Sequence, residues 1–231
     1  TKMTQPMVTL ASELTTGKEY KKLNELILLL MRLSLVISFL FSVSLFFYIE
    51  PLLKMLLSVS WHSQDYVNAS IAIVIMSISI TIGIPQFISR AVLQGVGMHW
   101  KASIGKVVAS VISFVTGVYL MFFGYGLIGA SIGWGLIWVL PGIVYFPRLI
   151  SKFMKIKQSK IFRVVYIPGY FIGMVLAVVG FLINRNRTEF SLLNILTGEI
   201  ILTIITIILF LLYQKIFATN VNVKQLIFKS K

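Results

Sequence analysis

The chain has 231 residues, of which 58% are hydrophobic and 12% are charged, and its mean hydropathy is +0.93. Soluble domains are about 25% charged and about 45–50% apolar, so this composition excludes that class and favours a membrane protein. The absence of Cys excludes disulfides and thiolate metal sites. A net charge of +14 would suggest nucleic acid in a soluble chain. In a membrane protein it reflects basic loops, and no nucleic-acid partner is expected.

The chain begins with a polar stretch, residues 1–25, which lacks the basic-then-apolar pattern of a signal segment and is predicted to be a cytoplasmic loop. Six apolar segments follow, each long enough to cross a bilayer as a helix. We expect the first to stop at the Glu50-Pro51 pair and the second to tolerate Pro85 internally. A tight hairpin is expected around residues 124–126. The six segments are Leu26–Ile49, Ala69–Leu93, Val107–Phe123, Leu127–Phe146, Val165–Ile183 and Leu192–Tyr213.

The basic residues alternate with these segments. Of the 21 Lys and Arg residues, 17 fall in the two terminal stretches and in the second and fourth loops, whereas 3 fall in the other loops. Because Lys and Arg collect in cytoplasmic loops, both termini are predicted to be cytoplasmic. The predicted fold class is all-α, a polytopic membrane protein with a bundle of about six transmembrane helices. Its predicted parts are the loop 1–25, the transmembrane domain 26–213 and the basic cytoplasmic tail 214–231.

No catalytic pattern is visible, so we predict no enzyme, no cofactor and no metal site. The two histidines, His62 and His99, fall in loops predicted to face opposite sides of the membrane. The fourth loop, residues 148–157, interleaves cations with apolar residues and is expected to lie on the membrane surface, where it would contact anionic lipid headgroups. The small residues Gly129 and Gly133 predict close helix packing. Trp61, Trp134, Trp138 and Tyr145 are interpreted as interfacial anchors.

Three stretches resemble segments of one transporter family. Residues 6–13 followed by 17–19 are similar to a cytoplasmic loop between the eighth and ninth helices of polysaccharide flippases. Residues 86–97 followed by Trp100-Lys101 resemble the segment of those proteins that has a Leu-Gln-Gly sequence before a basic turn. Residues 124–133 resemble their hairpin with the sequence Gly-Leu-Ile-Gly-Ala. The family is the polysaccharide biosynthesis branch of the multidrug/oligosaccharidyl-lipid/polysaccharide exporter superfamily, and the resemblance covers most of residues 5–150.

This resemblance implies that the chain is the carboxy-terminal part of a flippase, the last six of fourteen helices, which would work with an amino-terminal lobe missing here. The implied substrate is an undecaprenyl-diphosphate-linked oligosaccharide, carried across the bacterial inner (plasma) membrane for synthesis of a surface polysaccharide such as O-antigen. Membrane lipids are the other expected partner. Two alternatives stay open. One is a drug/cation antiporter of the same superfamily, and the other is a membrane assembly subunit that transports nothing.

Four residues are candidates for substrate binding. Arg32 lies inside the first apolar segment, where it either extends to the headgroups or faces a cavity between lobes and attracts the diphosphate. Guanidinium suits phosphate because it donates two parallel hydrogen bonds. Gln86, Arg90 and Gln94 are spaced by four and therefore share one helix face, which either lines a translocation route or serves for packing at a helix end.

Glu199 is the single candidate for ion coupling. It is the only carboxylate predicted to lie well inside an apolar segment. A carboxyl group in that position must be neutral or paired, which suits a residue that exchanges a proton or cation. The alternative is a neutral Glu that makes a hydrogen bond to a neighbouring helix.

Overall fold

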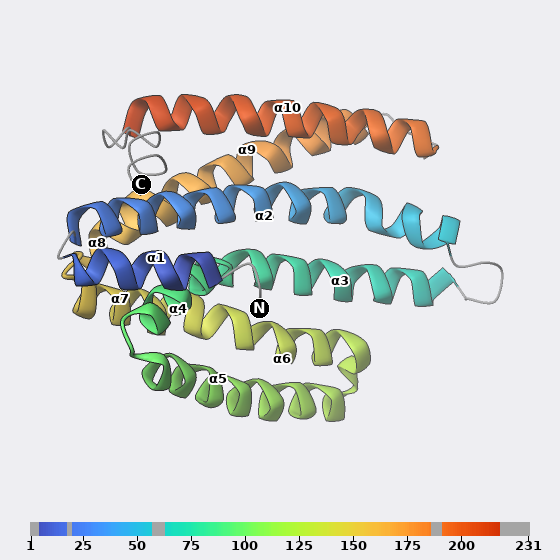
Figure 1. Ribbon diagram of the computed structural model, residues 1–231. Helices are drawn as coiled ribbons and strands as arrows, with labels where there is room; N and C mark the ends of the chain where they lie inside the picture. Colours follow the sequence, from blue (N-terminus) through green and yellow to red (C-terminus); the bar gives the residue numbers. More distant parts are fainter. Residues whose placement is uncertain (1–4, 18–19, 57–62, 186–190, 218–231) are drawn as a thin grey trace.

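The structure, a computed structural model, describes residues 5–17, 20–56, 63–185 and 191–217 (Figure 1). Within these ranges the chain is helical and contains no strand. Its α-helices and three short π-helical turns are α1 (Gln5–Thr16), α2 (Tyr20–Leu56), α3 (Ser63–Gly83), α4 (Pro85–Gly95), α5 (His99–Leu120), η1 (Met121–Tyr125), α6 (Gly126–Leu140), η2 (Pro141–Tyr145), α7 (Phe146–Met154), α8 (Gln158–Ile161), η3 (Phe162–Tyr166), α9 (Ile167–Asn184) and α10 (Leu192–Phe217).

Five continuous helical stretches in the described residues are long and apolar enough to cross a membrane. One of them, His99–Met154, folds back on itself at η1, where Gly124 and Gly126 adopt φ values of 86° and 45°. Glycine populates this region without the steric penalty of a Cβ atom. As a result α5 and α6 run side by side in opposite directions (Figure 1), and the described chain makes six passes through the bundle. The all-α polytopic fold class is confirmed.

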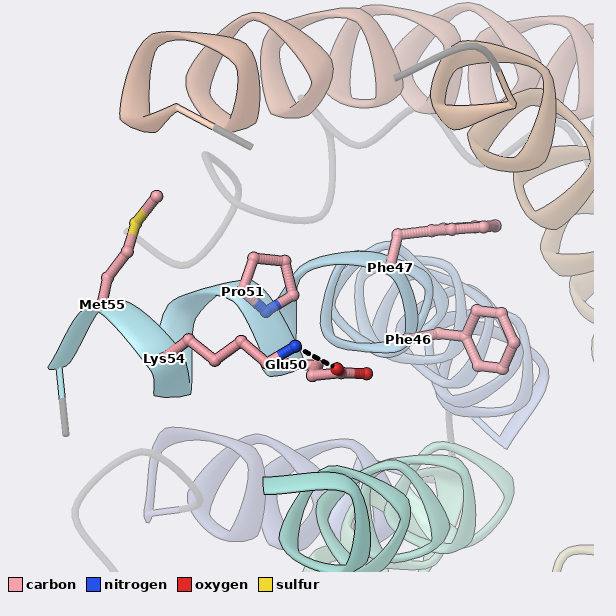
Figure 2. A pocket seen from close by; sticks show the side chains of 6 residues that line it. All are labelled: Phe46, Phe47, Glu50, Pro51, Lys54 and Met55. Atoms are coloured by element: carbon pink, nitrogen blue, oxygen red, sulfur yellow. Dashed lines mark hydrogen bonds and ion pairs between the residues drawn. The ribbon is translucent and has the colours of Figure 1, made fainter. Parts of the chain in front are cut away.

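The two prolines in the first pair of passes behave differently from expectation. The helix was predicted to stop at Glu50-Pro51, but α2 continues through Pro51 to Leu56. The Glu50–Lys54 ion pair, 2.6 Å between Oε1 and Nζ, spans the Pro51 turn and supports the continued helix (Figure 2). Pro85, in contrast, divides the predicted second segment into α3 and α4. Proline fits the first turn of a helix because it has no N–H to leave unpaired, so it starts α4.

The amino-terminal stretch is not the loop that we predicted. Residues 5–16 form helix α1, and α2 starts at Tyr20 rather than at the predicted Leu26. Met7 and Ala11 are buried because this face of α1 packs against α4. The contact is close at Gly95, where an added Cβ would approach the Ala11 Cβ to 2.8 Å. An apolar face with about one buried residue per turn is therefore enough to pack α1 against α4.

The fourth predicted loop also folds more than expected. Most of residues 148–157 belongs to α7, which has the predicted amphipathic character. Its apolar side, formed by Phe146, Ile150 and Met154, is buried in the protein core together with Leu93 of α4. Arg148 and Lys152 are exposed on the opposite side. Because protein already covers the apolar side, α7 has only its cations to offer to lipid headgroups.

The cations collect at one end of the bundle, which we call the basic end. It contains the start of α2, the α4–α5 turn, helices α7 and α8, and the end of α10 (left in Figure 1). At the opposite end the described cations are Lys54 and Arg185. The first described pass, α2, therefore begins at the same end of the bundle at which the last described pass, α10, ends, as the alternation of charge predicts. The cytoplasmic orientation of that end stays a prediction, and most of the predicted tail, residues 218–231, lies outside the described residues.

Candidate functional site

Arg32 is buried in the interior of the protein. Its side chain is 4% exposed, and the Arg32 Nε atom has no hydrogen-bond partner. The Arg32 Cζ atom lies 5.6 Å from the centre of the Tyr213 ring on α10. Tyr213 in turn donates a hydrogen bond of 2.5 Å from its hydroxyl group to the carbonyl of Val164 in η3. The guanidinium is therefore packed between α2, η3 and α10 and is not extended to the surface of the bundle.

The predicted polar face of α4 exists, and its burial changes along the helix. Gln86 is 1% exposed, and neither its Oε1 nor its Nε2 atom has a hydrogen-bond partner. Arg90 and Gln94, one and two turns further on, are half-buried. Helix α4 packs against α1, α2, α5 and α7. The face therefore runs from the protein interior towards the basic end of the bundle.

A cation that the sequence did not single out lies beside this face. The Lys106 Nζ atom is 5.1 Å from the centre of the Trp138 indole and 5.6 Å from the centre of the Phe87 ring. The two rings are themselves 5.3 Å apart, and Trp134 lies 5.7 Å beyond Trp138. Phe87 neighbours Gln86 on α4, while Lys106 and Trp138 come from α5 and α6. We refer to Gln86, Phe87, Arg90, Lys106 and Trp138 as the Lys106 cluster.

The electrostatics of the Lys106 cluster are positive. Arg90 is close enough for its charge to act on Lys106. Within the described part of the chain, neither cation makes an ion pair with a carboxylate. The rings of Phe87 and Trp138 hold Lys106 through their negative faces, an attraction of about 0.5–2 kcal/mol per ring. The cluster is thus a place where an anion would be favoured.

Lys106 and Trp138 were missed as site residues because each had another plausible role. Lys106 was counted with the loop cations because the third apolar segment was predicted to begin at Val107. Helix α5 in fact starts at His99, so Lys106 stands about two turns inside it. Trp138 was interpreted as an interfacial anchor, but its Nε1 atom is buried without a partner. The sequence carries no signal for the pairing of Lys106 with Trp138, because the pairing depends on the three-dimensional contact between α5 and α6.

Glu199 lies away from the Lys106 cluster. It is half-buried on α10, and the Ser44 hydroxyl of α2 donates a hydrogen bond of 2.8 Å to its Oε2 atom. The structure therefore brings Phe87 and Arg90 of α4 together with Lys106, whereas Gln86 is buried one residue before Phe87, and Arg32 and Glu199 join α2 and α10 at other points. No hydrogen bond or ion pair links any two of the five predicted site residues in the described ranges.

None of the three cavities described for residues 5–17, 20–56, 63–185 and 191–217 is lined by a predicted site residue. The largest described one, about 500 Å³, lies along the end of α2 and is lined by Phe46, Phe47, Glu50, Pro51, Lys54 and Met55 (Figure 2). All its described lining residues come from α2. The two charged side chains among them, Glu50 and Lys54, are paired with each other. Two smaller cavities, of about 330 and 300 Å³, are almost wholly apolar. None of them carries the polar groups expected of a binding site.

The chemistry open to these groups is electrostatic. The described residues contain no group of three or more His, Asp or Glu side chains placed to hold a metal ion. The Lys106 cluster offers N–H donors and positive charge, which suit the oxygens of a phosphate or carboxylate. Comparison of the chain with models of protein families, with curated proteins and with solved structures finds no match.

Proposed function

We propose that the chain is the membrane-embedded, carboxy-terminal part of a flippase. It would move an undecaprenyl-diphosphate-linked oligosaccharide across the bacterial inner membrane for surface polysaccharide synthesis, together with an amino-terminal lobe. The observation that supports this most is the pair Arg90 and Lys106, two cations without carboxylate partners in the described residues, which lie on helices of a six-pass bundle. Cations at such positions are costly and usually serve a substrate or ion pathway.

The break at Pro85 adds a means of movement. Helix α3 ends at Gly83 and α4 begins at Pro85, so the polar face of α4 is joined to the membrane-spanning α3 by a discontinuity. Interrupted helices at binding sites are a recurrent feature of transporters that alternate access between two sides. In this proposal, α4 changes its angle to α3 while α6 keeps its contact with α3. Arg32 would contribute a third positive charge only when α10 moves away from it.

A second candidate function has one specific observation in its favour. Glu199 is a carboxylate that lies about two turns inside the membrane-spanning helix α10, and it is paired with a neutral partner, Ser44. A drug/cation antiporter would use such a group to exchange a proton for a cation. It would have no use for the uncompensated Arg90 and Lys106, which would repel its cationic substrate. The flippase proposal therefore accounts for more of the described charges.

The proposal is tested by genetic complementation. The gene encoding the whole protein is expected to restore surface polysaccharide in a strain that lacks its own flippase. Arg90→Ala should lower that restoration while membrane abundance stays unchanged, and Lys152→Ala, which removes an exposed cation of α7, is the matched control. Equal restoration by the Arg90 and Lys152 variants would remove Arg90 from the route.

A second experiment separates the flippase from an assembly subunit. The purified chain is reconstituted in liposomes with a fluorescent lipid-diphosphate sugar, alone and with the co-expressed amino-terminal lobe. Flipping that requires the lobe supports the proposal. Export of a lipophilic cation by the same pair, without flipping, would support the antiporter. A chain that does neither in both preparations would be an assembly subunit.

A further inference from the structure

Three of the six described passes are interrupted near the basic end of the bundle (Figure 1). One is divided at Pro85 into α3 and α4, and the other two contain the π-helical turns η2 and η3, which precede α7 and α9. A proline or a π-helical turn leaves carbonyl groups without their usual backbone donor, and each such group is costly when it is buried. The groups that satisfy these carbonyls therefore determine how firmly each interruption is held.

The Gly142 carbonyl of η2 has lost both of its possible helical donors. The Phe146 N–H, which would bond to it in an α-helix, bonds instead to the Pro141 carbonyl. The next residue, Pro147, has no N–H. The hydroxyl group of Tyr166, a buried residue of η3, donates a hydrogen bond of 2.7 Å to the Gly142 carbonyl. A side chain from one interrupted pass thus replaces the missing donor of another.

The same replacement occurs in the next pass, at the Val164 carbonyl of η3. Its α-helical donor would be the N–H of Pro168, and proline has none. The Tyr213 hydroxyl of α10 donates a hydrogen bond of 2.5 Å to this carbonyl. Two tyrosine hydroxyl groups therefore connect η2, η3 and α10 in series, each at a carbonyl that a proline leaves free. As long as the second hydroxyl is in place, α10 also keeps Arg32 covered.

The junction between α3 and α4 is different. Helix α3 is anchored just before it, because the Thr81 hydroxyl donates a hydrogen bond of 3.1 Å to the Ser38 carbonyl of α2. Pro85 cannot donate to the Thr81 carbonyl, and no side chain of α4 makes a hydrogen bond outside its own helix in the described ranges. The buried Gln86 amide of α4 is unpaired, which costs free energy and favours a second arrangement in which it finds a partner.

We propose that the Tyr166–Gly142 and Tyr213–Val164 hydrogen bonds are locks that hold two interrupted passes rigid, and that the α3–α4 junction is the joint at which the bundle moves. In this proposal α4 carries α1, which packs closely on it at Gly95, while α7, α9 and α10 keep their relative positions. The core contacts between α4 and α7 are apolar and impose no fixed direction. The inference deepens the proposed function and rests on it only for what the movement serves.

The locks are tested by changing the tyrosine and the proline together in the full chain, purified in detergent. Tyr213→Phe should lower the melting temperature by about 2–4 °C, the effect of one hydrogen bond in a chain of this size. Pro168→Ala restores the backbone N–H, so Tyr213→Phe should no longer lower the melting temperature in that background. Tyr119→Phe, at an exposed tyrosine of α5, is the matched control and should change nothing.

The pair Tyr166→Phe and Pro147→Ala repeats this design at η2 and decides the matter if Pro168→Ala does not fold. Loss of the tyrosine effect in the alanine background would support the locks. An equal fall in melting temperature with and without the proline would overturn them, because the tyrosine would then not replace the missing N–H.

The joint is tested by distances between spin labels, which attach only at introduced cysteines because the chain has none of its own. Ser12→Cys on α1 with Ile71→Cys on α3 spans the joint, and Lys152→Cys on α7 with Met174→Cys on α9 spans the first lock. We expect two distances or a broad distribution across the joint and one narrow distance across the lock. Tyr166→Phe should broaden the distance across the lock.

Equally narrow distributions for the two pairs would overturn the joint, and a lock distance that Tyr166→Phe leaves narrow would overturn the lock. Neither measurement requires transport, so the two proposals can fail separately. Movement at the joint in a protein that flips no lipid-linked sugar would contradict the flippase alone, whereas flipping with one fixed distance across the joint would contradict the joint alone.

Discussion

Arg32 of α2 and Tyr213 of α10 come from opposite ends of the chain, and the Arg32 Cζ atom lies 5.6 Å from the centre of the Tyr213 ring. The hydroxyl group of the same tyrosine donates a hydrogen bond to the Val164 carbonyl. One side chain therefore connects the first pass, the last pass and the turn η3 that precedes α9. Together with the Ser44–Glu199 hydrogen bond, this polar connection fixes the position of α10 along α2.

Replacing Tyr213 by Leu should loosen α10. The change removes the ring from the buried guanidinium, at a cost of about 0.5–2 kcal/mol, together with the hydrogen bond to Val164. Tyr213→Phe keeps the ring and loses only the hydrogen bond, about 1 kcal/mol. Thermal unfolding of the detergent-solubilised chain should rank the proteins as wild type, Tyr213→Phe, then Tyr213→Leu. Equal melting temperatures for the two variants would show that the ring contact does not stabilise the fold.

Arg32 is expected to be a poor contributor to stability. Its guanidinium is buried, its Nε atom is unpaired, and no carboxylate of the described residues neutralises it. Replacing a buried, uncompensated charge by an apolar side chain of similar length is often neutral or stabilising. Arg32→Met should therefore melt at the same temperature as the wild type or higher, while the complementation assay reports a loss. A melting temperature several degrees lower would show that Arg32 is kept for stability alone.

The α5–α6 hairpin depends on the absence of side chains at Gly133. A Cβ atom there would collide with the backbone of Gly117 on α5, and the Ser113 hydroxyl hydrogen-bonds to the Gly133 carbonyl at the same place. Gly133→Val should separate the two helices and reduce the yield of monodisperse protein. Ile132→Leu, at the neighbouring position, which is 37% exposed, is the control. Size-exclusion profiles of the two variants after extraction measure the effect, and matching profiles would contradict it.

Variants of the Ser44–Glu199 hydrogen bond can distinguish a structural role of the Glu199 carboxyl group from a role in coupling transport to a proton. Glu199→Gln still offers an oxygen to the Ser44 hydroxyl, so the melting temperature should hardly change, while Ser44→Ala should cost about 1 kcal/mol. If Glu199 exchanges a proton, Glu199→Gln should also abolish the dependence of transport on a proton gradient. Transport that keeps its gradient dependence in this variant would leave Glu199 with the structural role.

The passes could be predicted from the sequence because length and charge determine them locally. Each apolar segment is long enough to span, and a single missing segment would mix the basic loops with the others. Gly124 and Gly126 marked the hairpin because a sharp reversal needs positive φ values. Pro51 and Pro85 could not be separated in this way. Whether a proline interrupts a helix depends on what its neighbours supply, and the ion pair around Pro51 has no counterpart at Pro85.

The contacts between segments that are far apart in the sequence could not be predicted. Helix α1 was predicted to be a loop because its first residues are polar, although its burial depends on the closeness of Gly95 to Ala11. The spacing of Gln86, Arg90 and Gln94 did predict a shared face. It did not predict that Lys106 of α5 and Trp138 of α6 would lie beside Phe87 of α4, because this requires the three-dimensional arrangement of the three helices.

The turn η1 has a consequence for how the protein enters a membrane. Residues Met121–Tyr125 contain no charged side chain, and Phe122 at the tip is 86% exposed. Moving this tip through the hydrocarbon layer requires no desolvation of an ion, whereas the ends of α2 and α3 that face each other in the sequence carry Lys54 and Asp65. Helices α5 and α6 can therefore be inserted together as a preformed pair, already joined along Gly117 and Gly133, rather than one after the other.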